Sequence, residues 1–482
     1  MYDIIVIGGG PAGVTAAVRA RELGASVALV ERDRMGGTCT NDGCVPTRVL
    51  AKAARLWRDA AQFDQYGVIT SPPELDFNQL MRRTQQVVYS IHEKKQLIGQ
   101  LTESGVTPFV GVGPAHFINP HAIELMNGEH LEADKFILCA GGRARRLDFP
   151  GEQYAITHSD VWTLKKLPES LLVVGGAATG CQLASIFNTF GVKVSILDVS
   201  PQLLRIEDEI VAKTIEDAFR ERGIEIISGI GGIERIDKLG DELELVFTHQ
   251  GEMTNRKAEA IILSTGWLGN LDLLNLSVAG VETVRNYIRV NDYLQTSAAH
   301  IFAAGDITGR MMLVQSAGYE ALAAAENAVL GVGNILQHTI VPHGGFTDPE
   351  YGSVGLTEEQ ALKQGEVVVA TVPYGEMDRA VIDDHTIGAC KIIVSKETHR
   401  ILGAHVVGEQ ALEIIHIIAA GMIADIWIEQ LAEMQIAYPT FTAIIGLAAR
   451  SIVRQLGEVP ISPQWRSLGK SQTAEWERRD LF

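Results

Sequence analysis

Two stretches of the chain repeat one order of apolar and polar positions. Residues 4–7 and 171–174 are runs of Val, Ile and Leu, and each precedes a glycine-rich turn and a stretch of helix-forming residues. Each stretch closes on a second apolar run that leads into glycine, at 135–142 and 260–266. A short apolar run bounded by glycine predicts a buried strand. The repeated strand–turn–helix order therefore predicts two nucleotide-binding domains built on parallel sheets.

The pattern changes in the last third of the chain. Residues 301–306 form one more apolar run before an alanine-rich helix, which we assign to the first domain. Farther on, apolar runs at 391–394 and 401–407 precede helices expected near 411–424 and 440–455. We therefore predict an α/β fold with two Rossmann-like dinucleotide-binding domains and a C-terminal α+β domain. The expected boundaries are 1–150 with 271–335, then 151–270, then 336–460, followed by a tail at 461–482.

Composition and charge narrow the choice of partners. The 482 residues carry 41 basic and 59 acidic side chains, a formal net charge of −18. This balance argues against nucleic acid or an anionic membrane as the main partner. No uninterrupted apolar run is long enough for a membrane span. Because Tyr2 and Asp3 lead directly into a strand, we expect no signal peptide and a cytoplasmic protein.

The first glycine turn predicts a dinucleotide site. Gly8, Gly10 and Gly13 form G-x-G-x-x-G between a strand and a helix. The first glycine permits a tight turn, the second lets a pyrophosphate approach the backbone, and the third lets helix and strand pack closely. Glu31 ends the next strand, 18 residues after Gly13, where an acid can bind both hydroxyls of a ribose.

A pair of cysteines follows this acid. Cys39 and Cys44 lie five positions apart within the segment 36–48. Five cysteines are too few for a disulfide scaffold in a chain of this length, so the pair is better explained by redox chemistry. We expect both thiols on one helical turn, where they can close a disulfide and pass electrons outward by thiol–disulfide exchange.

Together these motifs resemble the flavoprotein pyridine nucleotide-disulfide oxidoreductases, the group of dihydrolipoamide dehydrogenase, glutathione reductase and mercuric reductase, over about residues 2–460. The resemblance implies FAD, a nicotinamide nucleotide and a homodimer formed through the C-terminal domain, whose start matches at 341–358. It makes Cys39 the outer, interchange thiol and Cys44 the inner thiol that contacts the flavin. The cofactor-binding residues expected are Gly8, Gly10, Gly13, Glu31, Gly37, Thr38, Arg48, Ala115, Gly141 and Asp306 for FAD, and Gly175, Gly180, Asp198 and Gly266 for the nicotinamide nucleotide.

The second glycine turn departs from the motif at one position. Gly175 and Gly180 flank Ala177, so an alanine takes the place of the middle glycine. Asp198 ends the following strand and favours NADH, because its carboxylate would repel the 2′-phosphate of NADPH. Arg205 leaves NADPH open, since relatives that use NADPH have a basic residue near this place. A solvated surface charge explains Arg205 equally well.

The proton-transfer site departs further from the resemblance. Relatives carry a His-Pro-x-x-x-Glu segment, in which the histidine exchanges protons with the outer thiol of the other subunit and the glutamate orients it. This chain has Tyr438 and Ala443 at those two places. A tyrosine, with an ordinary pKa of about 10, is a poor base near neutrality, whereas a histidine near 6.5 is well placed. Mercuric reductases also have a tyrosine there, but this chain lacks their C-terminal cysteine pair, since no cysteine follows Cys390.

One more departure lies beside the expected flavin. Relatives usually pair a lysine four residues after the inner cysteine with a glutamate after the second glycine motif. This chain has Arg48 and Gln182 there, so the positive charge is kept and the balancing carboxylate is lost. We therefore expect a shifted flavin potential.

The sequence predicts an enzyme that passes electrons from NAD(P)H through FAD and the Cys39–Cys44 disulfide to an acceptor, a small-molecule or protein disulfide, with Tyr438 at the proton-transfer site. Two alternatives stay open. The first is reduction of a thiol-bound metal ion, as in mercuric reductases. The second is a dihydrolipoamide dehydrogenase-like protein or a redox-sensing flavoprotein with slow turnover.

Overall fold

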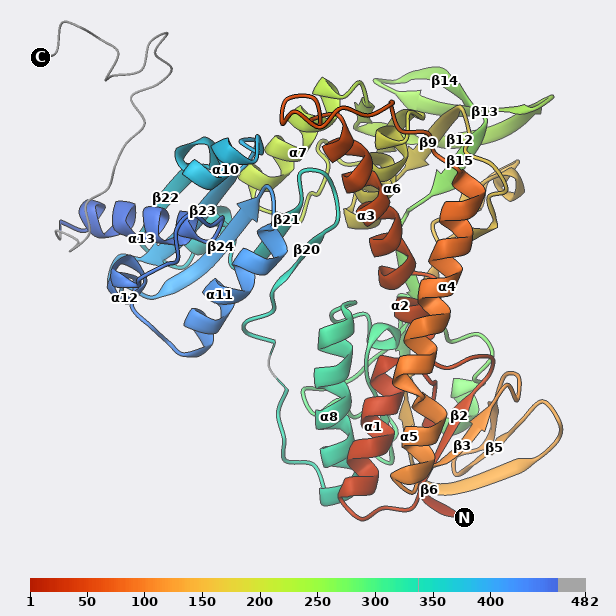
Figure 1. The fold of residues 1–482 in the computed structure, drawn as a ribbon. Helices are drawn as coiled ribbons and strands as arrows, with labels where there is room; N and C mark the ends of the chain where they lie inside the picture. Colours follow the sequence, from red (N-terminus) through yellow and green to blue (C-terminus); the bar gives the residue numbers. More distant parts are fainter. Residues whose placement is uncertain (337, 458–482) are drawn as a thin grey trace, which may run out of the picture. The chain divides into compact units, whose positions relative to one another are not determined.

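The computed structural model describes residues 1–336 and 338–457, which form two compact units (Figure 1). The first unit comprises 1–206, 215–341 and 345–348, and the second comprises 207–214, 342–344 and the chain from Pro349 onward. The α/β fold class is confirmed. The tail predicted at 461–482 lies outside the described residues, and the finer boundaries of three domains stay a prediction.

The first unit begins with a seven-stranded sheet whose order is β3-β2-β1-β6-β5-β4, with β19 also paired to β6. Strands β3, β2, β1, β6 and β19 run parallel, whereas β4 and β5 are antiparallel additions. The strands are β1 (Tyr2–Ile7), β2 (Val27–Glu31), β3 (Thr107–Val110), β4 (His116–Asn119), β5 (Ala122–Glu124), β6 (His130–Leu138) and β19 (Ile301–Ala303).

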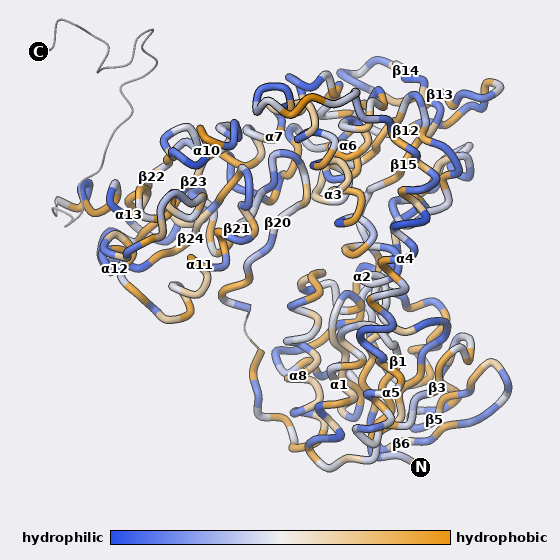
Figure 2. The backbone as a smooth tube through the Cα atoms, viewed as in Figure 1, coloured by the Kyte–Doolittle hydropathy of each residue, from blue (hydrophilic) through white to orange (hydrophobic). Residues whose placement is uncertain are grey.

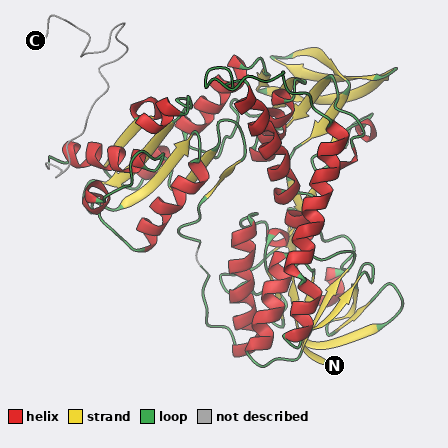
Figure 3. Cartoon of the chain, viewed as in Figure 1, coloured by secondary structure: helices red, strands yellow, loops and turns green. Residues whose placement is uncertain are grey.

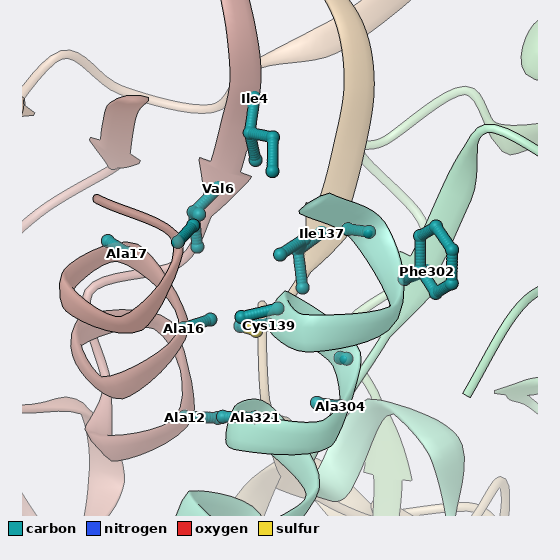
Figure 4. Close-up of a cluster of buried hydrophobic side chains, with 14 of the residues drawn as sticks. Ile4, Val6, Ala12, Ala16, Ala17, Ile137, Cys139, Phe302, Ala304 and Ala321 are labelled. Carbon is teal, nitrogen blue, oxygen red and sulfur yellow. The ribbon is translucent and has the colours of Figure 1, made fainter. Parts of the chain in front are cut away.

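Small side chains allow two helices to pack closely on this sheet. Along β1, Ile4 and Val6 point to one face, where α1 (Pro11–Glu22) and α8 (Val314–Leu330) cover them. Figure 4 shows Ala12 of α1 next to Ala321 of α8 within this cluster, and Ala16 next to Cys139. The packing fixes the start of α1 directly after the first glycine turn.

Helices between β2 and β3 carry the cysteine segment. They are α2 (Gly37–Asn41), α3 (Cys44–Ala60), α4 (Phe77–Lys95) and α5 (Leu97–Glu103). Gln96, with a positive φ of 42°, separates α4 from α5. Leu50 and Ala54 of α3 pack against Ile186 and Phe190, in the last turn of α6 (Ala178–Thr189) and just beyond it.

A second parallel sheet, of order β11-β10-β9-β15-β8, completes the core of the first unit. Its strands are β8 (Ile156–Thr157), β9 (Ser170–Val174), β10 (Lys193–Asp198), β11 (Glu225–Ser228) and β15 (Ala260–Leu263). An antiparallel sheet adds β12 (Ile230–Leu239), β13 (Glu242–His249) and β14 (Glu252–Ala258). Two short antiparallel pairs follow, β7 (Gly142–Ala144) with β16 (Trp267–Gly269) and β17 (Thr283–Val284) with β18 (Tyr287–Ile288).

The second unit is built on a five-stranded sheet of order β20-β21-β24-β23-β22. Figure 3 shows helices beside its strands. The strands are β20 (His343–Gly345), β21 (Tyr351–Gly355), β22 (Val367–Pro373), β23 (Ala389–Ser395) and β24 (Ile401–Val407). The helices are α9 (Glu358–Leu362), α10 (Asp378–Ile382), α11 (Ala411–Ile423), α12 (Ile428–Glu433) and α13 (Ala443–Gln455), and the start of α7 (Glu209–Glu221) also belongs here.

A buried ion cluster attaches segment 207–214 to this sheet. The Lys391 ammonium lies 2.9 Å from a carboxylate oxygen of Asp208 and also pairs with Glu358. Ser353 donates a 2.7 Å hydrogen bond to the buried carboxylate of Glu207. Burial alone would raise the pKa of Asp208, but the Glu358 amide and the Lys391 ammonium lower it by more, and the net shift is downward. The cluster therefore holds a charged segment inside an apolar unit.

Hydrophobic and hydrophilic positions are interspersed along the helices (Figure 2). In the part of the chain that the structure describes, we find no helix long and apolar enough to cross a membrane.

Candidate functional site

The first glycine turn has the shape that a dinucleotide requires. A Cβ atom on Gly8, whose φ is +116°, would clash with the carbonyl of Cys139, and one on Gly13 would clash with the carbonyl of Gly8. These two glycines serve the packing of strand and helix. Gly10 differs, because the nearest atom to a Cβ there would be the Gly37 Cα at 3.6 Å, an ordinary contact. The open space at Gly10 fits the approach of a pyrophosphate at the start of α1.

Each glycine turn is tied to an acid at the end of the following strand. Glu31 accepts a 2.6 Å hydrogen bond from the amide of Gly9 and a 2.9 Å bond from the amide of Asp33. Asp198 accepts from the amide of Gly176 and, at 2.6 Å, from the amide of Ser200. The two predicted ribose acids therefore occupy equivalent places in the two sheets.

The backbone conformation of the second turn accommodates an alanine in place of the middle glycine. Ala177 precedes α6 with φ −80° and ψ −177°, and Gly10 precedes α1 with φ −76° and ψ −177°. This extended conformation is open to any residue, so the methyl group causes no backbone strain. Ala177 is exposed. Gly175 and Gly180 keep their packing roles, because a Cβ on either would clash with backbone carbonyls.

The cysteine segment lies directly on the first glycine turn. The Gly36 amide donates a 2.9 Å hydrogen bond to the Gly9 carbonyl, and a Cβ on Gly37 would lie 2.9 Å from the Gly10 Cα. The expectation of two thiols on one helical turn is wrong. Cys39 lies on α2 and Cys44 is the first residue of α3, because the chain leaves the helix at Asp42 and Gly43.

The hydrogen bond between the two thiols shifts their pKa values in opposite directions. Both cysteines are free thiols, with Cys39 half-buried and Cys44 exposed. The hydrogen bond between them lowers the pKa of Cys44 to about 7 and raises the pKa of Cys39 well above its ordinary range, with burial adding to the rise. The Lys95 ammonium opposes the rise at Cys39. These opposite shifts favour the thiolate on Cys44 over the thiolate on Cys39.

Side chains distant in sequence hold the loop between the two thiols. The Asn41 amide donates to the Met35 carbonyl at 3.1 Å, and the His92 ring is hydrogen-bonded to the Asn41 oxygen at 2.8 Å. The Trp162 indole donates a 2.9 Å bond to the Asp42 carbonyl. The sequence pattern alone does not identify these residues. An amide side chain between two cysteines is the only available signal, and it does not name its partners.

The carboxylate of Asp306 is free to accept hydrogen bonds from a ligand. Its carboxylate makes no hydrogen bond to any described residue. Burial, and then the charge of Glu320, raise the pKa of Asp306 to about 6. The negative charge of Asp306 in turn raises the pKa of both cysteines. A partly buried carboxylate without a donor fits the hydroxyl groups of a ribityl chain.

The other residues expected to bind cofactors are two glycines with positive φ, a threonine on a helix and a buried alanine. Gly141 and Gly266 both have positive φ, at +68° and +102°, next to the paired strands β7 and β16. Thr38 lies on α2 beside Cys39. Ala115 is buried ahead of β4, so only its backbone is offered for a contact.

Arg48 and Gln182 both contact Phe346. The Arg48 guanidinium lies over the Phe346 ring, 4.6 Å from its centroid. Gln182 accepts a 3.0 Å hydrogen bond from the Phe346 amide. The glutamine thus keeps an acceptor at the place of the glutamate in relatives but carries no charge.

Tyr438 lies in the second unit and is 77% exposed. It precedes Pro439 through a cis peptide bond. Its hydroxyl donates a 2.6 Å hydrogen bond to the carboxylate of Asp378, and this bond raises the pKa of Tyr438 above its ordinary value of 10. Ala443, in place of the orienting glutamate, is the first residue of α13.

The three remaining cysteines, Cys139, Cys181 and Cys390, are buried, and burial raises the pKa of each. They are therefore inert as nucleophiles. Within 1–336 and 338–457, no group of three or more His, Cys, Asp or Glu side chains could hold a metal ion.

Comparison with known proteins agrees with this geometry. The family model described as pyridine nucleotide-disulphide oxidoreductase matches residues 2–321, and its dimerisation domain matches residues 341–449, which supports a homodimer. The chain is 32% identical to a mercuric reductase of Lysinibacillus sphaericus over 93% of this chain and 82% of that protein. It is 30% identical to a dihydrolipoyl dehydrogenase of Bacillus subtilis (strain 168) over 93% of this chain and 97% of that protein.

A solved structure is similar over nearly the whole chain. The HOCl-induced flavoprotein disulfide reductase RclA from Escherichia coli superposes with a TM-score of 0.83 at 27% identity, covering 93% of this chain and 99% of that one. Its Cu(II) complex gives the same TM-score. The predicted family, cofactors and class of reaction are thereby confirmed. The chain belongs to the pyridine nucleotide-disulphide oxidoreductase family and is an NAD(P)H-dependent flavoprotein disulfide oxidoreductase that uses FAD.

Proposed function

We propose that this enzyme reduces an external disulfide with electrons from NADH, which pass through FAD to Cys44 and then leave through Cys39. One observation carries the proposal: the hydrogen bond from the Gly36 amide to the Gly9 carbonyl, 2.9 Å long, joins the cysteine segment to the first glycine turn. When bound, FAD supplies two-electron transfer between the nicotinamide and the thiols. A dinucleotide seated on that turn would run along the cysteine segment.

Residues of the first sheet would hold the FAD. The turn of Gly8, Gly10 and Gly13 would receive the pyrophosphate, and Glu31 would accept hydrogen bonds from the ribose. Asp306 would accept from the ribityl chain, since its carboxylate has no donor among the described residues. Gly37, Thr38, Arg48, Ala115 and Gly141 complete the proposed set.

The second turn would bind NADH. Gly175 and Gly180 shape this turn. Gly266 lies just after β15, a strand of the same sheet as β9. Asp198 already accepts from two backbone amides, so its carboxylate is fixed where a ribose hydroxyl can donate to it. A 2′-phosphate would meet this negative charge. The next residue, Val199, is exposed and offers no cation.

Thiol–disulfide exchange would take place at Cys39, the outer thiol. Because the pKa of Cys39 is raised, this thiol has to lose its proton before it can attack a disulfide. In a homodimer of this family, the Tyr438 of the partner subunit would be the group beside it. A phenol is a weaker proton acceptor than an imidazole at neutral pH. We therefore propose that the preferred acceptors are disulfides whose leaving thiol has a low pKa and departs as the thiolate.

The test is anaerobic oxidation of NADH and NADPH by the purified FAD-loaded enzyme against a panel of acceptors. The panel holds lipoamide, glutathione disulfide, an aromatic nitrobenzoate disulfide, an oxidised thioredoxin, mercuric ion and cupric ion. We expect NADH to be preferred and the aromatic disulfide to be reduced fastest. Cys39→Ser should abolish disulfide reduction, yet still let NADH reduce the bound FAD.

Two outcomes would overturn the proposal. One is disulfide turnover that survives Cys39→Ser. The other is NADH oxidation that responds only to mercuric or cupric ion, which would favour metal-ion reduction instead. Rapid oxidation of dihydrolipoamide at neutral pH would contradict the proposal that Tyr438 is a weak proton acceptor. The cytoplasmic location stays a prediction from the sequence.

A further inference from the structure

We propose that Asp378 takes over the task of the missing glutamate: it orients the Tyr438 phenol and accepts its proton while the phenol takes a proton from the outer thiol of the other subunit. The inference rests on the proposed function. Its starting point is the 2.6 Å hydrogen bond from the Tyr438 hydroxyl to Asp378. Ala443 offers only a methyl group, so it cannot orient a phenol.

The two segments that carry this pair are fastened together by other contacts. Asp378 is the first residue of α10, and its neighbour Arg379 lies over the Phe441 ring, 5.6 Å from its centroid. Arg379 also pairs with Asp383 at 2.8 Å. Phe441 is buried and lies 6.0 Å from the Tyr374 ring, centroid to centroid. The start of α10 and the chain after Tyr438 therefore hold their relative places without the phenol–carboxylate bond.

The direction of that bond defines what the phenol can do. Its only proton points at Asp378, so the phenol oxygen presents its lone pairs to any other group. Such an oxygen can accept a hydrogen bond from a thiol. The arrangement suits Cys39, the outer thiol, which has to lose its proton before it can attack a disulfide.

The proton moves twice, and each bond that forms is matched by one that breaks. As the Cys39 sulfur attacks a disulfide, its proton passes to the Tyr438 oxygen and the Tyr438 proton passes to Asp378. A bond forms between Cys39 and one substrate sulfur, and the substrate S–S bond breaks. The leaving thiolate then takes a proton back from Tyr438, which recovers its own from Asp378. The Cys44 thiolate next attacks Cys39, forms the Cys39–Cys44 disulfide and releases the second substrate thiolate to solvent.

The experiment compares acceptors with different needs for a proton. FAD-loaded enzyme is reduced anaerobically with one equivalent of NADH and rapidly mixed with excess hydroxyethyl disulfide or with an aromatic nitrobenzoate disulfide. Asp378→Asn should slow the first reaction on the order of 10²-fold, within the range of general acid–base catalysis. It should slow the second reaction less, because both reactions need the Cys39 proton removed but only the aliphatic thiolate also needs a proton as it leaves. Asp378→Glu should restore most of the lost rate.

Two control variants distinguish a positioning role of Asp378 from a purely structural one. Asp384→Asn makes the same change in an exposed residue of the same segment, and it should leave both rates unchanged. Tyr438→Phe should match Asp378→Asn, and combining the two should bring no further loss. Asp378→Asn that slows both acceptors equally, or neither, would overturn the inference alone. Disulfide reduction that survives Cys39→Ser would instead overturn the proposed function on which it rests.

Discussion

The buried pair of Lys391 and Asp208 permits a quantitative prediction about stability. The Lys391 side chain is 8% exposed and that of Asp208 is 2% exposed, and their charged atoms lie 2.9 Å apart. Lys391→Met removes the cation and leaves the Asp208 carboxylate buried beside Glu358 without it. Breaking a buried pair in this way costs about 3–5 kcal/mol of unfolding free energy. We expect the midpoint of thermal unfolding to fall by roughly 10 °C.

A matched control lies a few positions farther along the chain. Lys396 forms an ion pair of 2.7 Å with Glu366, and both side chains are exposed. Lys396→Met should therefore leave stability unchanged within error. The assay is urea and thermal unfolding of the FAD-loaded enzyme at one fixed protein concentration, because dimerisation and cofactor both add apparent stability.

A double variant tests the reasoning itself. Asp208→Asn combined with Lys391→Met removes both charges of the pair, and it should be less destabilised than the sum of the two single changes. The pKa of Asp208 is lowered in the fold, so its contribution is complete above the unfolded value near 3.8 and is lost as the pH falls below it. A loss in Lys391→Met no larger than in Lys396→Met would refute the argument.

Three further predictions concern the cofactor and thiols. In the two-electron-reduced enzyme, the charge-transfer absorbance of the Cys44 thiolate should rise with pH through a midpoint near 7; a flat titration between about pH 6 and pH 8 would contradict this. Gly10→Ala should keep the fold but purify with less flavin, whereas Gly8→Ala should lose the fold, as circular dichroism and flavin content will show; equal damage in both would count against the separation of roles. FAD affinity, measured by fluorescence titration, should weaken as the pH falls through about 6, because ribityl hydroxyls donate better to an ionised Asp306. Asp306→Asn should remove that pH dependence.

The local parts of the site can be predicted from sequence because short-range order determines them. A strand, a tight glycine turn and a helix follow one another along the chain, and the acid at the end of the next strand lies beside the turn. This order predicts Glu31 and Asp198, and the structure places each against its turn.

Contacts between distant segments are not predictable in the same way. The Trp162 indole reaches the Asp42 carbonyl across 120 residues of sequence, and Asp378 meets Tyr438 across 60. Nothing in the residues near Tyr438 indicates that a carboxylate from another helix stands where Ala443 offers none. The expectation of one helical turn for both cysteines is wrong for a local reason, because the chain turns at Gly43 and starts a new helix at Cys44.

The bonds of Glu31 and Asp198 to their own glycine turns have a consequence for the kinetics of cofactor capture. A free glutamate side chain loses roughly 1.5–2 kcal/mol of rotamer entropy when it is immobilised. Here both carboxylates are immobilised by backbone amides within the protein chain itself. If Glu31 and Asp198 bind ribose as we propose, an incoming nucleotide would meet an acceptor that is already in position. Such preorganisation favours rapid, shape-selective capture over slow rearrangement after encounter.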